Sequence, residues 1–353
     1  MAAKTRKKEN SPVSPAEIAK MLNSSLKTQV FFADPTKLLS NVDRWLPTGC
    51  QLVDLASGQN HMGFDRGGIP LGRVVELYGP PDVGKSSMAI LVARTANVNG
   101  WIVIYIDAEH ALDRHRCNLM GLNLKDIIHM QPAYIEQAFE YVTGALVKIR
   151  ERKINTPVIF LWDTLARTKT REQYEGKDKL GSRARAVRSG IVNHLGDSLP
   201  LHKASLLILN HMVTGNITSG GGLKDSPGGT ALRHEASLRW YMTFLSGGRI
   251  KKSEKVIGTR AKLIVQESNI CIPKREVGIS VFFDRGVDND DSNLLFLSAS
   301  KVINENAGWY TWELEGKEHK FRRWDFGTYI RENKLQEIVR DEVNKSFMDI
   351  YPN

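Results

Sequence analysis

The chain is poor in cysteine and has no long apolar segment. Its three cysteines, Cys50, Cys117 and Cys271, are an odd number and lack the spacing of a metal site. We therefore expect reduced thiols, as in a cytosolic compartment. No apolar run approaches the roughly 18 residues that would span a bilayer, and the polar N-terminus lacks the apolar centre of a secretion signal. We therefore expect neither secretion nor insertion in a membrane.

Acidic residues are outnumbered in this chain. Lys and Arg total 49 against 39 Asp and Glu, which gives a net charge of +10 and a pI near 9.4. Such an excess is typical of proteins that bind a polyanion, most simply nucleic acid. A basic surface that serves only solubility explains the charge alone equally well. The 353 residues suffice for one large α/β core with small appendages.

The most informative motif is a complete G-x-x-x-x-G-K-[ST] loop over residues 79–86. An apolar strand precedes it at 74–78, and a helical pattern follows it at 86–96. In this context backbone N–H groups and the helix dipole would face phosphates, Lys85 would reach the terminal phosphates, and Ser86 could ligate Mg²⁺. We prefer this interpretation to a chance glycine-rich turn. The predicted nucleotide-binding residues here are Gly79, Pro80, Pro81, Asp82, Val83, Gly84, Lys85, Ser86 and Ser87.

Apolar strands alternate with helical segments through the middle of the chain. Continuous apolar strands separated by helices imply a mostly parallel sheet that is covered on both faces. The fold class is therefore predicted to be α/β with a mostly parallel central sheet. The sequence predicts strands over 103–107, 158–163, 206–210, 261–265 and 277–283, and a helix over 135–149.

Two carboxylates are predicted to lie at strand ends near the phosphate loop. Asp163 ends an apolar strand, where a second acid is expected to help hold Mg²⁺. The alternative is an aspartate that only caps the next turn. Glu109 follows another strand, at the sheet edge where ligands bind in open α/β folds, and could orient and deprotonate an attacking water. The alternative there is an ordinary loop acid.

Residues from about 47 to 286 resemble the RecA-type recombinases. The segment Asp107-Ala108-Glu109-His110-Ala111-Leu112-Asp113 matches that family's signature, and residues 68–73 resemble its lead into the phosphate loop. Residues 307–310 and the helix predicted over 326–348 resemble the small C-terminal domain of bacterial members. The resemblance implies a RecA-like P-loop ATPase core that uses ATP and Mg²⁺.

The resemblance also implies roles for individual residues. Glu109 takes the part of the catalytic carboxylate beside Lys85, and Asp113 contacts the adenine. Arg116 stands near the place of the aromatic side chain that usually stacks on the base, and its planar guanidinium could stack instead. Asn210 precedes His211, where bacterial members have Asn-Gln and the Gln senses the γ-phosphate.

His211 resembles the corresponding residue of the recombinases of T-even phages. A histidine there can donate a hydrogen bond to phosphate, although its charge varies near neutral pH. The alternative is a histidine that bonds only to the local backbone. The chain also departs from the family at Glu267 and Asn269, where bacterial RecA has two lysines that reach a neighbouring copy's nucleotide.

Two segments are predicted to bind DNA by the same resemblance. Residues 171–188 correspond to the first DNA-binding loop and the helix after it, although a solvated helix face explains its charges equally simply. Residues 212–230 are rich in glycine, serine and threonine and correspond to the second loop. The residues predicted to contact DNA are Arg183, Arg185, Arg188, Thr214, Asn216, Ile217, Gly228 and Gly229.

Three regions are expected along the chain. Residues 1–44 hold a basic arm, a helix that begins near Ser14 and a short strand at 30–33, which would dock on a neighbouring copy. Residues 45–290 form the ATPase and DNA-binding core, and residues 291–353 form a small C-terminal domain.

The predicted function is ATP-dependent recombination. Copies would form a helical filament on single-stranded DNA and promote pairing and strand exchange with homologous duplex DNA, in the cytoplasm and near the nucleoid. Loader and single-strand-binding proteins are further candidate partners, and no membrane partner is expected. One alternative is an ATP-gated DNA-coating or mediator protein with little hydrolysis. Another is a DnaB-type hexameric helicase, against which the signature, the glycine-rich loop and the C-terminal domain argue.

Overall fold

The computed structural model describes residues 42–59, 63–110, 112–177, 181–196, 198–214 and 224–352, together with Met21 and Lys179. The chain divides into two units at Asp43, and the second is Arg44–Asn353. All of the structure below belongs to the second unit. The helix predicted near Ser14 and the strand predicted at 30–33 lie outside the described residues, as do Asn216 and Ile217.

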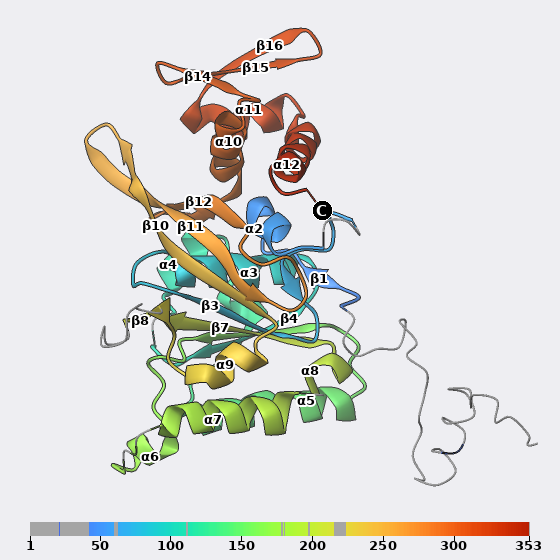
Figure 1. The fold of residues 1–353 in the computed structure, drawn as a ribbon, viewed down its shortest axis with the longest axis vertical. Helices are drawn as coiled ribbons and strands as arrows, with labels where there is room; N and C mark the ends of the chain where they lie inside the picture. Colours follow the sequence, from blue (N-terminus) through green and yellow to red (C-terminus); the bar gives the residue numbers. More distant parts are fainter. Residues whose placement is uncertain are drawn as a thin grey trace, which may run out of the picture. The chain divides into compact units, whose positions relative to one another are not determined.

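Within the described residues, a nine-stranded sheet occupies the centre of the second unit (Figure 1). Its order is β13-β12-β11-β10-β3-β7-β6-β4-β5. Neighbours from β10 to β5 run parallel, whereas those from β10 to β13 run antiparallel. The prediction of a mostly parallel α/β sheet is confirmed. The strands are β3 (Val74–Gly79), β4 (Ile102–Asp107), β5 (Ile127–Met130), β6 (Val158–Asp163), β7 (Ala204–His211), β10 (Leu238–Lys252), β11 (Lys255–Ser268), β12 (Glu276–Phe282) and β13 (Gly286–Asp288).

Helices cover both faces of this sheet. Side chains alternate along β6, so that Ile159 and Leu161 join one buried cluster while Phe160 and Trp162 join the other. Burial on both faces is why the strands are continuously apolar. The helices α5, α7 and α9 lie below the sheet in Figure 1 and α3 and α4 above it. Their bounds are α3 (Lys85–Val98), α4 (Arg114–Leu119), α5 (Ile135–Glu151), α6 (Arg171–Tyr174), α7 (Ser182–Gly190), α8 (Ser198–Leu201) and α9 (Gly229–Glu235).

Shorter elements complete the core. The strand β1 (Trp45–Leu46) pairs antiparallel with β2 (Ile69–Pro70), and β8 (Val213–Thr214) pairs antiparallel with β9 (Lys224–Asp225). The helix α2 (Gln51–Ala56) follows β1. Short helical turns occur at η2 (Leu124–Asp126), η3 (Ile191–Leu195) and η4 (Arg323–Asp325).

The C-terminal region continues the core and does not form one long helical tail. The prediction of a helix over 326–348 is wrong in one respect: the helix breaks, because Lys334 adopts a left-handed backbone conformation with φ of 56°. Phe326 and Phe347, on either side of the break, are buried in the same cluster as the sheet. The elements are α10 (Asn289–Ala299), β14 (Asn304–Asn306), β15 (Trp309–Leu314), β16 (Lys317–Arg322), α11 (Phe326–Glu332) and α12 (Gln336–Ile350).

Among the residues that the structure describes, none of the helices combines the length and the apolar character that crossing a bilayer requires.

Candidate nucleotide site

The phosphate loop joins β3 to α3 and depends on two glycines. A Cβ atom added at Gly79 would collide with the backbone carbonyl oxygen of Met242 on the neighbouring strand β10. Gly84 has φ of 107° and caps α3, a conformation that other residues rarely adopt. The helix begins at the next residue, so the unpaired N–H groups of its first turn border the loop. This arrangement is an anion cradle.

Lys85 is buried within this cradle, with 6% of its surface exposed. Its Nζ donates to the carbonyl oxygens of Gly79 at 3.1 Å and Pro80 at 2.7 Å. Burial lowers the pKa of Lys85 to about 8, and the carboxylates of Asp163 and Glu109 oppose that shift. The ammonium group therefore bonds to the loop's own carbonyls, which phosphate oxygens could replace.

Asp163 and Ser86 lie together at the end of the parallel strands. The β4–β6 register places Asp163 opposite Asp107. The Asp163 carboxylate accepts a hydrogen bond from the hydroxyl of Tyr105 at 2.9 Å and another from Ser86. Burial raises the pKa of Asp163, against the effect of those two hydrogen bonds. A hydroxyl beside a carboxylate is a donor set that Mg²⁺ accepts, so the residues fit the ion.

Three side chains lie close to one oxygen of the Glu109 carboxylate. Thr164 donates its hydroxyl to Glu109 Oε1 at 2.6 Å, His211 Nε2 lies 3.3 Å from the same oxygen, and Arg167 Nε lies at 3.9 Å. His211 reaches this place because the β3–β7 register sets it opposite Gly79. The histidine ring therefore faces the acid and the phosphate loop, while its backbone N–H donates to Asn210 Oδ1 at 3.1 Å.

Asp113 and Arg116 lie at the start of α4. Asp113 caps that helix by accepting from the backbone N–H of Arg116 at 2.6 Å. The guanidinium of Arg116 donates to the Ser87 hydroxyl at 2.9 Å, so it reaches the first turn of α3. Arg116 therefore lies beside the first turn of α3, and Asp113 is engaged as a helix cap.

Most of these groups line one cavity of about 600 Å³, but Asp113 does not. Lys85, Ser86, Glu109, Arg116, Asp163 and His211 all line it. The sequence therefore predicted six side chains that the fold brings to one cavity, although they come from five separate places along the chain.

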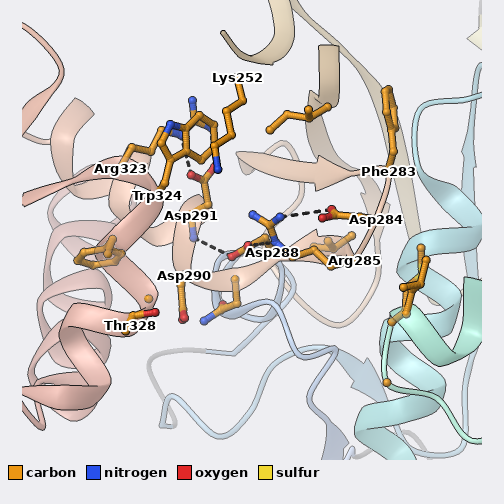
Figure 2. A pocket seen from close by; sticks show the side chains of 18 of the residues that line it. Lys252, Phe283, Asp284, Arg285, Asp288, Asp290, Asp291, Arg323, Trp324 and Thr328 are labelled. Carbon is orange, nitrogen blue, oxygen red and sulfur yellow. Dashed lines mark hydrogen bonds and ion pairs between the residues drawn. The ribbon is translucent and has the colours of Figure 1, made fainter. Parts of the chain in front are cut away.

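A larger cavity, of about 870 Å³, lies elsewhere (Figure 2). Charged side chains line it, but they pair with each other: Arg323 contacts Asp291 at 2.7 Å and Arg285 contacts Asp288 at 2.7 Å. Lys252 Nζ lies 5.9 Å from the centre of the Trp324 ring, and both side chains line the cavity. Most of its charges are paired, so the smaller cavity, which the phosphate loop lines, is the candidate site.

The residues predicted to bind DNA are only partly within the described structure. On α7, Arg183 donates to the Ala166 carbonyl at 2.5 Å, Arg185 lies 3.6 Å from Glu172, and Arg188 is exposed. Thr214 lies in β8. Gly228, with φ of 114°, caps α9, and Gly229 is the first residue of that helix.

Sequence reasoning missed a buried polar network behind the second loop. Glu76 and Arg239 are 0% and 1% exposed, although both lie in apolar strands. An isolated charge inside such a strand was the available signal, because buried charges are rare unless they are paired. The partner of each lies on another strand, far away in sequence.

The parallel sheet, the loop between β3 and α3 and the acids at adjacent strand ends define a P-loop nucleoside triphosphatase core. The family model for the RecA N-terminal domain matches residues 37–288. The chain belongs to the RecA family.

Curated relatives are similar over most of their length. Protein RecA of Syntrophobacter fumaroxidans is 29% identical over 310 residues, which cover 86% of this chain and 85% of that protein. Protein RecA of Thermus thermophilus is 30% identical over 270 residues, covering 76% and 75%. Protein RecA of Xylella fastidiosa is 28% identical over 310 residues, covering 84% and 83%.

Proposed function

We propose that this protein is a DNA-dependent ATPase of the RecA type that acts in DNA recombination and repair. Copies of it assemble as a helical filament on single-stranded DNA and promote pairing and strand exchange with homologous duplex DNA. The observation that carries the proposal is one cavity shared by the phosphate loop, Glu109 and His211. His211 is also the last residue of β7, immediately before the second predicted DNA-binding loop, residues 212–230.

In this proposal the cavity binds ATP through residues of the chain itself. The Lys85 ammonium exchanges the carbonyls of Gly79 and Pro80 for phosphate oxygens. Ser86 and Asp163 would hold Mg²⁺, which would supply positive charge to offset that of the phosphates. Arg116 stacks on the base, and Asp113 contacts the adenine.

Glu109 is proposed as the general base for hydrolysis. Its Oε1 lies within reach of Thr164 and His211, so a change in the position of the histidine ring alters the environment of the carboxylate. When the His211 ring turns to donate to a terminal phosphate, Glu109 is released to orient a water and accept its proton.

The same movement is proposed to control DNA binding. A histidine bonded to the terminal phosphate orders residues 212–230, and the filament grips DNA until hydrolysis removes that contact. Thr214, Asn216, Ile217, Gly228 and Gly229 then hold the strand. The arginines of α7, Arg183, Arg185 and Arg188, serve the first loop, and phosphate contacts of this kind agree with the net charge of +10.

Assembly is proposed to use residues 1–44, which dock on a neighbouring copy. The expected setting is the cytoplasm of a bacterial or phage-infected cell, in association with the nucleoid, and His211 favours a phage type of recombinase. Loader and single-strand-binding proteins are proposed as further partners.

A second candidate is an ATP-gated DNA-coating or mediator protein with little hydrolysis. Glu267 and Asn269 support it, because they replace the cations that relatives direct at a neighbour's nucleotide. A hexameric DnaB-type helicase is less well supported, because the family match over residues 37–288 is to the RecA N-terminal domain.

Phosphate release and electron microscopy together test the proposal. Filaments on single-stranded DNA with a slowly hydrolysed ATP analogue, and phosphate release that DNA stimulates, are the expected results. Filaments without stimulated release would favour the DNA-coating protein. Closed rings would favour the helicase.

A further inference from the structure

A buried ion pair lies beneath the two ends of the second loop. Glu76 on β3 and Arg239 on β10 are register partners, and Arg239 Nε lies 2.6 Å from Glu76 Oε2. Both side chains are almost fully buried. Two charges removed from water are tolerated only with further hydrogen bonds, so the remaining partners of this pair are informative.

Those partners come from both ends of the loop. The amide of Asn210, one residue before His211, donates to Glu76 Oε1 at 2.9 Å and to the Pro227 carbonyl at 2.7 Å. Arg239 Nη2 donates to the Ser226 hydroxyl at 3.2 Å. The segment that leaves β7 and the segment that enters α9 are therefore bonded to the same ion pair.

Glu267 completes the network from β11. Its Oε2 lies 3.0 Å from Arg239 Nη1, and its Oε1 lies 3.4 Å from Arg233 Nε on α9. A lysine at this place, as the resemblance to bacterial RecA would suggest, would add a third cation beside two arginines. The Glu267 carboxylate, which is 37% exposed, is therefore placed between the two arginines.

We infer that Glu267 and Arg239 are positioning residues that couple the position of His211 to that of Ser226 and Pro227, which precede α9. This inference rests on the proposed function. When His211 moves toward a phosphate, Asn210 moves with it, and its amide is shared between Glu76 and Pro227. The network transmits that movement to Ser226, Pro227 and the start of α9.

The test compares DNA affinity in two nucleotide states. For the wild type and Glu267→Ala, the Kd for a fluorescent single-stranded oligonucleotide is measured with a slowly hydrolysed ATP analogue and with ADP. We expect the ratio of the Kd with ADP to the Kd with the analogue to fall about fivefold or more in Glu267→Ala, the size of a typical coupling. The Kd for a fluorescent ADP should stay within about twofold, because Glu267 is not among the residues that line the nucleotide cavity.

The matched control is Glu151→Ala on α5. It removes an exposed ion pair, Lys148 to Glu151 at 2.8 Å, far in sequence from both loops, and should leave the ratio unchanged. Glu267→Gln controls for a folding defect, because it keeps the shape of the side chain. Since it removes only the charge, the ratio of the two Kd values should fall by less than in Glu267→Ala.

Two outcomes are decisive in different ways. A wild-type ratio well above one that is unchanged in both Glu267 variants would overturn the coupling and leave the proposed function standing. A wild-type ratio near one would overturn the proposed function itself, and the coupling with it.

Discussion

At the scale of single residues, the nucleotide cavity holds charges that a triphosphate would rearrange. Lys85 donates to backbone carbonyls, Asp163 accepts from two hydroxyl groups, and Glu109 is shared by Thr164 and His211. Each of these contacts involves a group that has a proposed task toward ATP, Mg²⁺ or water. The charged side chains of the cavity therefore already have partners within the protein, and a triphosphate that binds there must replace some of those partners.

Nucleotide affinity is expected to fall as the pH rises above about 8. The pKa of Lys85 is lowered to about 8 by burial, and a bound phosphate would raise it again. Above pH 8 binding must therefore take up a proton, and Kd should rise by up to about tenfold per pH unit. A titration with fluorescent ADP between pH 7.5 and 9.5 measures this dependence. A Kd that does not change over that range would contradict the buried amine.

Glu109→Gln should bind ATP and assemble on DNA but turn over about 10²- to 10⁴-fold more slowly, because the amide cannot accept the proton of the water. Phosphate release and a nucleotide-binding assay check both halves. Lys85→Ala is the comparison, since it should lose hydrolysis through loss of phosphate binding. Failure of Glu109→Gln to bind ATP would mean that the acid has a different role.

At the scale of elements, the sequence predicted what local patterns specify. The apolar strands and the loop at 79–86 were found because burial on both faces and the phosphate motif leave direct signals. The break at Lys334 was missed because neither Gly nor Pro marks it. Of the β10–β11 hairpin, only residues 261–265 of β11 were predicted from the sequence.

Some residues of the candidate site could be predicted from the sequence and others could not. The side chains of Lys85, Ser86 and Asp163 followed from the motif and from the ends of strands. The pair of Glu76 with Arg239 did not, because it depends on β3 and β10 becoming neighbours, which no local pattern specifies.

The packing of α7 against α5 gives a prediction about two helical glycines. A Cβ at Gly190 would collide with the ring of Phe139, so Gly190→Ala should lower the free energy of unfolding by about 1–3 kcal/mol. Gly144→Ala is the matched control, because a Cβ there has nothing within 4 Å, and it should stabilise by up to about 1 kcal/mol. Urea denaturation measures both. Equal effects of the two variants would refute the close contact between the helices.

At the scale of the whole molecule, the phosphate loop motif and the end of β7 are neighbours in the sheet. Gly79, at the start of the phosphate loop, pairs with His211 across β3 and β7, and residues 212–230 follow directly. The sheet is therefore the connection between ATP and DNA in the proposed function. In the proposed function, a change at the phosphates reaches residue 212 through β3 and β7, and the network around Arg239 carries it to Ser226 and Pro227.

The most direct test of this connection is the affinity of the full chain for single-stranded DNA with a slowly hydrolysed ATP analogue, with ADP and with no nucleotide, followed by electron microscopy of each mixture. We predict tight binding and helical filaments with the analogue, and weak binding without filaments in the other two. Equal affinity in all three, with no filaments in any, would contradict the account.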